Sequence, residues 1–396
     1  MRILLITAGS RGDVEPFAAL ARRATADGHT VRVVAPDNSG ADLDGLDVVS
    51  MGVDFSRMIE DQGVSPLAAM RSFRTTVRPV MHGVIVGSAR HALDYRPDVL
   101  VTHPKVLSGP LVAEALGIPH VLVEIVPVMT PTRAFPAAGT VTRTLGPLNR
   151  LTYRAAGASA AMFRSDLDEV AKLTGGSRRG AAPPAATLMP VSPAILDRPA
   201  DWPSSVHLTG PWRSVGQGSA LPTAVADFIG RGGYVYAGFG SMAVGDARAR
   251  ARAVVQGIRL HGKRALLATG LGGLEVPEDL RSDDVLVVPS VDHEAVLPLA
   301  DAAVIHGGIG TVQAAARAGT VTVIVPFIAD QPFWGARMHA RGLSPAPIPQ
   351  RRLTPALLAT ALAAAEHCRP AAAATARTMA TEDGTGAALA VLGTLA

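Results

Sequence analysis

The stretch Ala302-Ala-Val-Ile-His-Gly-Gly-Ile-Gly-Thr311 has the clearest local pattern in the chain. An apolar run that suits a buried strand ends at His306, and three glycines and a helix-compatible run follow. Glycine lets the backbone approach a ligand, and a helix start presents unpaired N–H groups with a positive dipole. We therefore predict a strand, a turn and a helix around an anion site suited to a diphosphate; a plain glycine turn is the alternative. The predicted contacts are His306, Gly307, Gly308, Gly310 and Thr311.

Units of the same kind recur on both sides of this stretch, because short β-rich runs alternate with helix-length amphipathic runs. The chain has 396 residues, and a single hydrophobic core stops growing at roughly 250–300 residues. We expect an α/β protein with two doubly wound, Rossmann-like domains that face a central cleft. The expected strands are Arg2–Thr7, Thr30–Ala35, Val99–Thr102, His120–Val126, Tyr234–Gly238, Arg264–Thr269, Val285–Val288, Ala302–His306 and Val321–Val325.

The domain boundary is predicted where proline-rich sequence interrupts the alternation of strands and helices. Residues 1–197 are expected to form the first domain, and residues 198–219 the linker. Residues 220–375 would form the second domain, and residues 376–396 a helix that packs back on the first. Ligands of open α/β sheets bind at the carboxyl ends of the strands, so the turns after strands are the places to look for function.

Composition excludes several classes of protein. Hydrophobic residues make up 48% and charged residues 18% of the chain, which excludes a disordered protein. The one cysteine, Cys368, excludes an internal disulfide, and no Cys/His group has zinc spacing. The net charge of +4 lies on scattered arginines, which argues against a nucleic-acid partner. Glu124 and His306 interrupt the most apolar runs, and the first run is too short for a signal peptide, so we expect a cytoplasmic protein without stable membrane insertion.

A second turn, Gly238-Phe-Gly-Ser-Met-Ala243, matches the glycine fingerprint of dinucleotide-binding domains. That fingerprint requires an acidic residue near the end of the next strand to hold the ribose. The next expected strand, Arg264–Thr269, offers none, which disfavours a nicotinamide oxidoreductase. A smaller role remains, in which the Ser241 hydroxyl contacts a phosphate.

The turn after the first strand reads Gly9-Ser-Arg-Gly-Asp-Val-Glu-Pro16, with Pro16 expected at the first helical position. Asp13 is placed to accept a proton from a nucleophile in the cleft, and Arg11 to face an anion. The alternative is that Asp13 and Glu15 only complement the dipole of the helix start. The residues alone leave both possibilities open.

The turn Pro326-Phe-Ile-Ala-Asp-Gln-Pro-Phe-Trp-Gly335 follows another expected buried strand. Asp330 and Gln331 supply acceptor and donor groups suited to sugar hydroxyls, and ordinary helix capping before Pro332 is compatible with that role. Two Asp-x-Asp pairs, Asp42-Leu-Asp44 and Asp166-Leu-Asp168, follow no expected strand, so we interpret them as solvated faces and expect no metal site. The scattered histidines His82, His91 and His103 also lack ligand spacing.

Together the four turns resemble those of inverting, metal-independent nucleotide-sugar glycosyltransferases of the GT-B fold, family 1. The resemblance is strongest to bacterial natural-product enzymes of the vancomycin type and to sterol glucosyltransferases. It covers almost the whole chain and rests on motifs in family order. These motifs are Gly9-Ser-Arg-Gly-Asp13 with Pro16, Gly238-Phe-Gly-Ser241, His306-Gly-Gly-Ile-Gly-Thr311 and Asp330-Gln-Pro-Phe-Trp-Gly335.

The resemblance implies a role for each turn. Asp13 would be the general base; many relatives have a histidine in this loop, and here there is none, so Asp13 acts alone or the base lies elsewhere. A UDP- or dTDP-sugar would be the co-substrate, with no other cofactor. The diphosphate contacts would be Ser10, Arg11, Ser241, His306, Gly307, Gly308, Gly310 and Thr311; the nucleobase contacts Ser290 and Val291; the sugar contacts Asp330 and Gln331.

The first domain would shape a pocket for the acceptor from flexible apolar side chains, although such side chains more often belong to a core. The implied activity is transfer of a hexose to a hydroxyl of a hydrophobic natural-product or sterol-like acceptor, by a monomer or homodimer. Alternatives are a catalytically idle GT-B protein that binds a nucleotide or partner, and a sugar-nucleotide epimerase. The candidate pocket residues are Met51, Phe55, Met58, Phe73, Met81, Val128, Met129 and Phe135.

Overall fold

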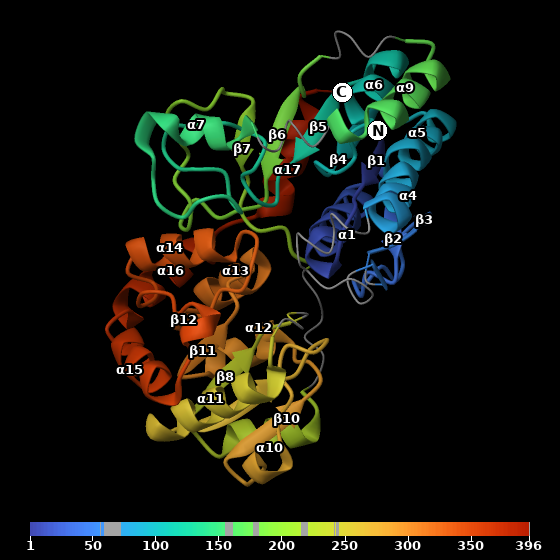
Figure 1. Cartoon of the computed structure of the whole chain (residues 1–396). Helices are drawn as coiled ribbons and strands as arrows, with labels where there is room; N and C mark the ends of the chain where they lie inside the picture. The colour runs from blue at the N-terminus through green and yellow to red at the C-terminus, as the bar shows by residue number, and fades with distance from the viewer. Residues whose placement is uncertain are drawn as a thin grey trace.

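The computed structural model describes residues 1–55, 57–58, 73–154, 161–176, 182–214, 221–240, 242 and 245–395. Figure 1 shows two α/β domains, the upper one built from the first half of the chain and the lower one from the second half. Each domain contains a parallel sheet with helices on both faces, as the alternating sequence pattern predicts.

The first sheet has seven parallel strands in the order β3-β2-β1-β4-β5-β6-β7. Three of them, β3, β6 and β7, were not predicted. β3 has only two buried side chains among its seven residues, and β7 is a three-residue edge strand, so neither has a strong apolar pattern. The strands are β1 (Arg2–Ile6), β2 (Thr30–Asp37), β3 (Val48–Asp54), β4 (Val99–Thr102), β5 (His120–Val123), β6 (Ala186–Met189) and β7 (Val206–Leu208).

Helix α1 (Arg11–Ala26) begins earlier than predicted, so the expectation that Pro16 is the first helical residue is wrong. Ser10 is the N-cap and Asp13 the third helical residue, and Pro16 lies inside the helix at the cost of one backbone hydrogen bond. The other helices that the structure describes in the first half are α4 (Arg78–His82), α5 (Ser88–Tyr95), α6 (Gly109–Leu116), α7 (Asn149–Thr152) and α9 (Arg164–Leu173). Described π-helical turns span Phe73–Val77 and Gly83–Gly87, and a 3-10 turn spans Gly146–Leu148.

The second sheet has five parallel strands in the order β10-β9-β8-β11-β12. Its strands are β8 (Tyr234–Gly238), β9 (Arg264–Ala268), β10 (Val285–Val288), β11 (Ala302–Ile305) and β12 (Thr322–Ile324). The helices of the second half are α10 (Thr223–Gly230), α11 (Ala247–Leu260), α12 (His293–Val296), α13 (Ile309–Ala318), α14 (Gln331–Ala340), α15 (Pro355–Glu366), α16 (Arg369–Met379) and α17 (Gly384–Gly393); 3-10 turns span Glu278–Leu280, Leu297–Leu299 and Gln350–Arg352.

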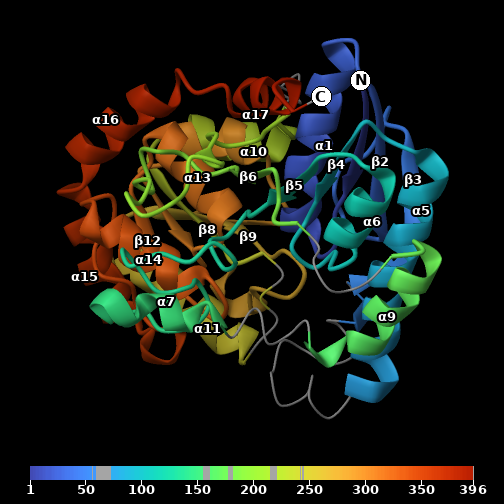
Figure 2. The same cartoon turned by 90° about the horizontal axis from the view of Figure 1, so that it is seen from above.

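Contacts join the halves in several places, and two of them bear on the arrangement of the domains. Helix α17 returns to the first domain and lies beside α1, where Arg23 forms an ion pair of 2.8 Å with Asp383 (Figure 2). At the centre, the Gln313 side chain of α13 accepts the Ser192 N–H at 2.8 Å and donates to the Pro190 carbonyl at 3.0 Å. One apolar cluster extends through this junction and contains buried residues of both sheets. The domain boundaries given above stay a prediction.

Candidate active site

Strand register brings the candidate turns together in pairs. In the first sheet Ile6 is opposite Thr102, so the turns after β1 and β4 are neighbours. In the second sheet Gly238 is opposite Ile305, so the turns after β8 and β11 are neighbours. Each domain therefore has two adjoining turns at the carboxyl edge of its sheet, the edge at which ligands of such sheets bind.

Asp13 lies in a network formed by the first pair of turns. Its Oδ2 accepts the Ser10 backbone N–H at 2.9 Å and lies 3.3 Å from the Lys105 ammonium. Its Oδ1 lies 3.2 Å from Nε2 of His103, and its side chain is 25% exposed. The approach of Lys105 requires Gly9, because a Cβ there would lie 1.9 Å from the Asp13 carboxylate and 2.6 Å from the ammonium. The opening turn therefore both starts α1 and leaves a partly exposed carboxylate at the carboxyl edge of the first sheet.

The tautomer of His103 follows from its two contacts. Its Nδ1 accepts the Lys105 backbone N–H at 3.2 Å, so in the neutral ring the proton is on Nε2. Nε2 can then donate to Asp13 Oδ1. Burial lowers the pKa of His103, which keeps the ring neutral, although the hydrogen bond to Asp13 opposes this shift. His103 thus orients the carboxylate as a neutral donor.

The electrostatics of Asp13 favour its ionised form. Burial by itself would raise the pKa of this carboxyl, but the Lys105 ammonium and the hydrogen bond from His103 oppose it. Together with the Ser10 N–H they hold the pKa of Asp13 well below its usual range. The sequence analysis did not predict the contacts of His103 and Lys105 with Asp13. Both residues closely follow the expected strand Val99–Thr102, and this position was the one sequence feature that could have indicated them.

The second pair of turns has an open helix end. Gly308 is the N-cap of α13 and has no side chain with which to cap the helix. The first hydrogen bond of the helix runs from Val312 N–H to the Gly308 carbonyl at 3.0 Å. The amides of Ile309, Gly310 and Thr311 precede it and have no acceptor within the helix, which is the arrangement that binds anions.

His306 lies against this helix end. A Cβ on Gly308 would lie 2.5 Å from His306 Nε2, so only glycine leaves room for the ring. Burial, assisted by the nearby His293, lowers the pKa of His306 to about 4. The ring is therefore neutral near pH 7 and can donate one hydrogen bond. Its Nδ1 is buried and has no partner within the described part of the chain. Ser241, the hydroxyl predicted beside it, lies outside the described residues.

The turn after β12 presents Asp330. One carboxylate oxygen, Oδ2, accepts the Trp334 indole N–H at 2.8 Å. The backbone N–H of Asp330 also hydrogen-bonds to the carboxyl, and no other described residue donates to Oδ1. Burial, with a contribution from the negative charge of Asp13, raises the pKa of Asp330 to about 6. Gln331 is used differently: its Oε1 accepts the N–H groups of Phe327 and Ile328 at 2.8 and 3.2 Å. Gln331 therefore holds its own loop, and its predicted sugar contact stays a prediction.

The predicted nucleobase contacts follow β10. Ser290 is exposed and Val291 is half-buried. Next to them His293 lies 3.0 Å from the Tyr236 hydroxyl, and burial and the positive charge of Arg11 lower the pKa of His293. Arg11 itself pairs with Glu15 at 2.5 Å and is largely exposed. Its electrostatic effect on His293 indicates that the opening turn of one domain lies near the β10 turn of the other.

The predicted acceptor residues lie in different places. Met51 and Phe55 are buried, and Met58, Phe73 and Met81 pack against them in one apolar cluster. Within it the Phe55 ring lies 5.6 Å from the Lys105 ammonium, which brings this cluster close to Asp13. Val128 and Phe135 belong to the central cluster instead, and Met129 donates its N–H to Glu124.

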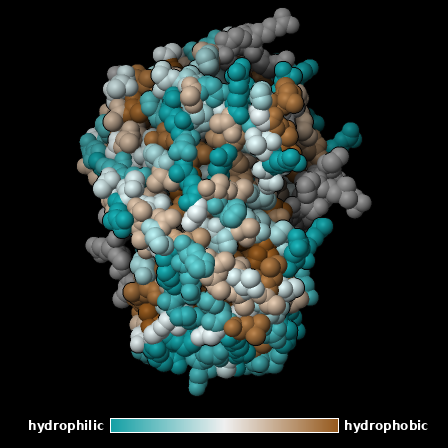
Figure 3. Space-filling view, turned by 90° about the vertical axis from the view of Figure 1, so that its left-hand side faces the viewer, coloured by the Kyte–Doolittle hydropathy of each residue, from teal (hydrophilic) through white to brown (hydrophobic). Residues whose placement is uncertain are grey.

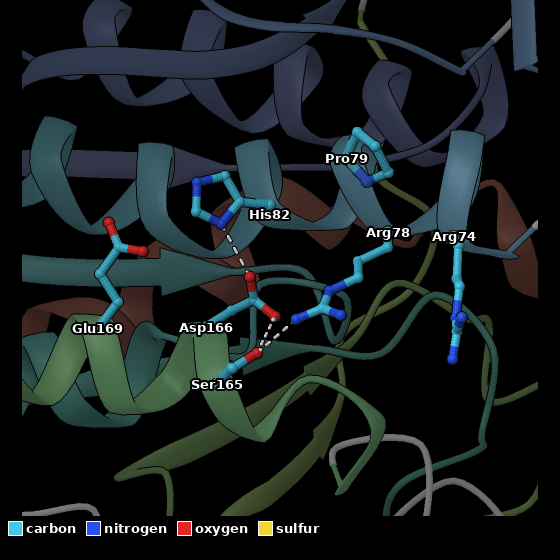
Figure 4. Close-up of a pocket in the computed structure, with 7 residues that line it drawn as sticks. All are labelled: Arg74, Arg78, Pro79, His82, Ser165, Asp166 and Glu169. Atoms are coloured by element: carbon cyan, nitrogen blue, oxygen red, sulfur yellow. Dashed lines mark hydrogen bonds and ion pairs between the residues drawn. The ribbon is translucent and has the colours of Figure 1, made fainter.

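A separate surface cavity of about 380 Å³ lies between α4 and α9 (Figure 4). Asp166 is buried there and accepts from His82 at 2.8 Å, while Arg78 donates to Ser165 at 2.9 Å. The interpretation of Asp166 as part of a solvated face is therefore wrong, because the contact with His82 and the packing of α9 against the Gly83–Gly87 turn and α6 cover it. Within the described ranges no cluster of acidic, histidine or cysteine residues has the geometry of a metal site.

Comparison with known proteins assigns the family. Residues 3–136 match the "Glycosyltransferase family 28 N-terminal domain" and residues 216–365 match "UDP-glucoronosyl and UDP-glucosyl transferase". The O-mycaminosyltylonolide 6-deoxyallosyltransferase of Streptomyces fradiae is 33% identical over 394 residues, which cover 91% of this chain and 89% of that protein. The chain belongs to family 1 of the GT-B glycosyltransferases.

Other members of the family are larger. A sterol 3-beta-glucosyltransferase of Arabidopsis thaliana is 28% identical over 88% of this chain, which spans 58% of the plant protein. The corresponding protein of Cryptococcus neoformans is 30% identical over 91% of this chain, which spans 25% of the fungal protein. The match to these relatives thus covers one part of each.

Solved structures confirm the fold. The kitacinnamycin glycosyltransferase superposes with a TM-score of 0.73 at 20% identity, covering 100% of this chain and 98% of that one. VinC, solved in complex with dTDP, gives a TM-score of 0.65 at 20% identity, with 100% and 98% coverage. The GT-B arrangement predicted from the sequence is therefore confirmed for this family member.

Proposed function

We propose that this chain transfers a hexosyl group from a UDP- or dTDP-sugar to a hydroxyl of a hydrophobic natural-product or sterol-like acceptor. The observation that carries the proposal is the pairing of unlike groups across the two sheet edges: an ionised carboxylate, Asp13, on one side and the open N-terminus of α13 on the other. Asp13 contributes to the raised pKa of Asp330, which supports a single cleft shared by both domains.

The leaving diphosphate would bind at α13. The amides of Gly310 and Thr311 and the neutral His306 would donate to its oxygens, where negative charge develops as the sugar departs. Fixed donors of this kind act in the transition state without reorganising. They supply the stabilisation that a metal ion provides in other transferases, which supports a metal-independent reaction.

Asp13 would act on the acceptor. It takes the proton of the acceptor hydroxyl while that oxygen forms a bond to the anomeric carbon, and the bond from this carbon to the diphosphate oxygen breaks with its electron pair. Attack from the face opposite the diphosphate inverts the anomeric centre. The proton then leaves Asp13 for solvent, and the nucleoside diphosphate is released. General-base catalysis of this kind contributes about 10²–10⁴-fold.

His103 and Lys105 would position Asp13 without exchanging its proton. Oδ2 already accepts from Ser10 and contacts Lys105. Oδ1 contacts only His103 among the described residues, so it is the oxygen with a lone pair for the acceptor. His103 already has its proton on Nε2, and its Nδ1 is occupied by a backbone N–H. It therefore has no vacant position for a second proton at this face.

The proposed binding places of the donor sugar and of the acceptor are supported by less specific features. Asp330 Oδ1 is the acceptor group offered to a sugar hydroxyl, and the apolar cluster that contains Phe55 adjoins Asp13. Relatives named for sterol 3-beta-glucosyl transfer and for 6-deoxyallosyl transfer to a tylonolide support an apolar, hydroxylated acceptor.

The decisive experiment is an assay of nucleoside diphosphate release from a panel of UDP- and dTDP-sugars, with and without hydroxylated apolar acceptors. We expect release that depends on both substrates, and a product whose mass increases by one anhydrohexose. Nuclear magnetic resonance of that product gives the anomeric configuration. Donor binding without release on any acceptor would instead identify a nucleotide-binding protein that does not transfer sugar.

A further inference from the structure

The segment between β5 and β6 has an unusual charge pattern. Residues 125–165 contain five arginines and no aspartate or glutamate. Exposed apolar side chains alternate with these arginines around helix α7. We call this region the α7 surface and define it by seven side chains. They are Val141, Arg143, Leu145, Leu148, Arg150, Leu151 and Arg154.

Exposed apolar side chains concentrate on the α7 surface. Val141 and Leu145 are each 44% exposed, Leu151 is 48% exposed and Leu148 is 59% exposed. The described part of the chain has ten large apolar side chains that are at least 38% exposed, and four of them fall within these eleven residues. Figure 3 views the side of the molecule on which α7 lies and shows apolar patches between hydrophilic ones. Such clustering on a folded domain marks an interaction surface rather than random exposure.

The arginines of the α7 surface are available for an anionic partner. Within the described ranges Arg143 and Arg154 form no ion pair. The pKa of Asp201 is lowered mainly by the hydrogen bond from Thr132, and the positive charge of Arg150 adds to this shift without a direct contact. The side chains are exposed. Arg143 and Arg154 therefore lie among leucines without a paired carboxylate in the described ranges, while Arg150 interacts electrostatically with Asp201.

The segment that carries this surface is held in place and reaches the cleft. Asn149 accepts the Leu145 N–H at 2.8 Å and donates to the Arg133 carbonyl at 2.8 Å, so the loop has a fixed shape. Earlier in the same segment, a Cβ on Gly139 would lie 3.6 Å from the backbone of Ala329, the residue before Asp330. The α7 surface is thus attached to a loop that touches the edge of the candidate active site.

These features favour lipid over protein. A second copy would bring arginines against arginines, so self-association is opposed by charge. A protein partner would need a carboxylate opposite each buried guanidinium, because an unpaired buried charge is strongly destabilising. An anionic lipid surface presents phosphate oxygens at every position, so each arginine finds one without a fixed arrangement of partners. Leucine side chains can insert among acyl chains without a pocket of matching shape.

We infer that the α7 surface docks this protein on an anionic lipid surface. Leu145, Leu148 and Leu151 enter the boundary between headgroups and acyl chains, while the neighbouring arginines bind phosphate groups. Docking brings the mouth of the cleft to a layer in which an apolar acceptor dissolves. The docking itself does not depend on the chemistry proposed for Asp13. No described helix is long and apolar enough to cross a membrane, so this contact is peripheral.

Vesicle sedimentation of the full chain tests this inference. We expect binding to phosphatidylcholine vesicles containing about 30% phosphatidylglycerol and little binding to phosphatidylcholine alone. Binding should fall in about 0.5 M salt, where charge interactions are screened. The variant Leu148→Ser/Leu151→Ser should lose at least about tenfold in partitioning, and Arg143→Glu/Arg154→Glu a similar factor.

The matched control is Leu260→Ser/Leu357→Ser, which changes two leucines of the second domain that are 66% and 38% exposed. It should bind vesicles as the parent chain does. Equal loss in the control, equal binding to neutral vesicles, or binding to an acidic protein without binding to vesicles would each overturn the inference. Thermal midpoints report folding of each variant. Donor affinity should be unchanged in all of them, so failure of docking and failure of the transferase proposal are separable.

Discussion

Two helices begin at the edges of the two sheets, and their N-termini differ. Helix α1 is closed by its own chain, because Asp13 accepts the Ser10 N–H and an ammonium and an imidazole complete the network. Helix α13 follows its N-cap Gly308, and within the described part of the chain no side chain caps its first amides. The same strand-turn-helix unit thus gives a fixed carboxylate in one domain and a vacant anion site in the other. We infer that the first domain holds the Asp13 carboxylate in position before any ligand binds. The amides at the start of α13 in the second domain would gain their hydrogen-bond partners only when the donor binds.

The strongest test of this contrast is Asp13→Asn. Asparagine keeps the shape and the contact with Ser10 but cannot accept the proton, so kcat should fall by about 10³-fold. Nucleotide affinity, set by α13, should change little. Steady-state kinetics and calorimetry measure the two. Glu15→Gln, in the same helical turn, is the control and should stay near parent activity; a similar drop there, or retained turnover in Asp13→Asn, would remove Asp13 from the role of base.

The open end of α13 is tested by His306→Ala. Loss of a neutral donor at the diphosphate should weaken nucleotide binding by about tenfold and lower kcat by roughly 10²-fold. Because His306 is already neutral above pH 5, with its pKa lowered to about 4, the parent enzyme should bind nucleotide without a histidine titration near neutrality. Isothermal titration against pH checks both points. Unaltered affinity in the variant would show that the diphosphate binds elsewhere.

A finer test separates orientation from proton transfer at His103. Glutamine places an amide N–H near the position of Nε2, so His103→Gln should keep kcat/KM within about fivefold, whereas His103→Leu should lose about tenfold. The hydrogen bond from His103 lowers the pKa of Asp13. Its loss in the leucine variant should raise that pKa and move the acid limb of the pH profile upward. A glutamine variant as inactive as Asp13→Asn would mean that His103 itself carries a proton.

The smallest expected effect concerns donor affinity and pH. Burial raises the pKa of Asp330 to about 6. As the pH falls through this value the carboxylate gains a proton and loses acceptor capacity, so the Kd for a sugar nucleotide should rise a few-fold between pH 7 and 5. Asp330→Asn carries no titrating group and should give a flat profile over the same interval. A slope that persists in this variant would assign the dependence to another group.

The sequence predicted a good part of this architecture, and its limits have physical causes. Apolar runs such as Ala302–His306 are buried on both faces and were recognised, while β3 and β7 lie at sheet edges with weak patterns. The contact of His103 with Asp13 depends on the pairing of β1 with β4, which no local pattern encodes. The burial of Asp166 likewise comes from packing between helices far apart in sequence.

The motif residues were easier to predict from the sequence than the neighbouring side chains that shift their pKa values. Asp13, His306 and Asp330 all follow strands and were predicted from that position. The chain of contacts from Lys105 to Asp13 was not predicted, because a lone lysine after a strand has no distinctive spacing. The requirement for glycine at position 308 was recognised only in general form; the structure adds that the His306 ring occupies the space of a side chain there.

The return of α17 to the first domain has a mechanical consequence. The polypeptide passes between the domains twice, once between Leu208 and Thr223 and again between Met379 and Gly384. Two connections between the domains restrict twisting of one domain against the other. Rotation about the line through both connections is then the motion that they oppose least. The Gln313 contacts with Pro190 and Ser192 cross between the two domains, so they would oppose a swing that moves the domains apart.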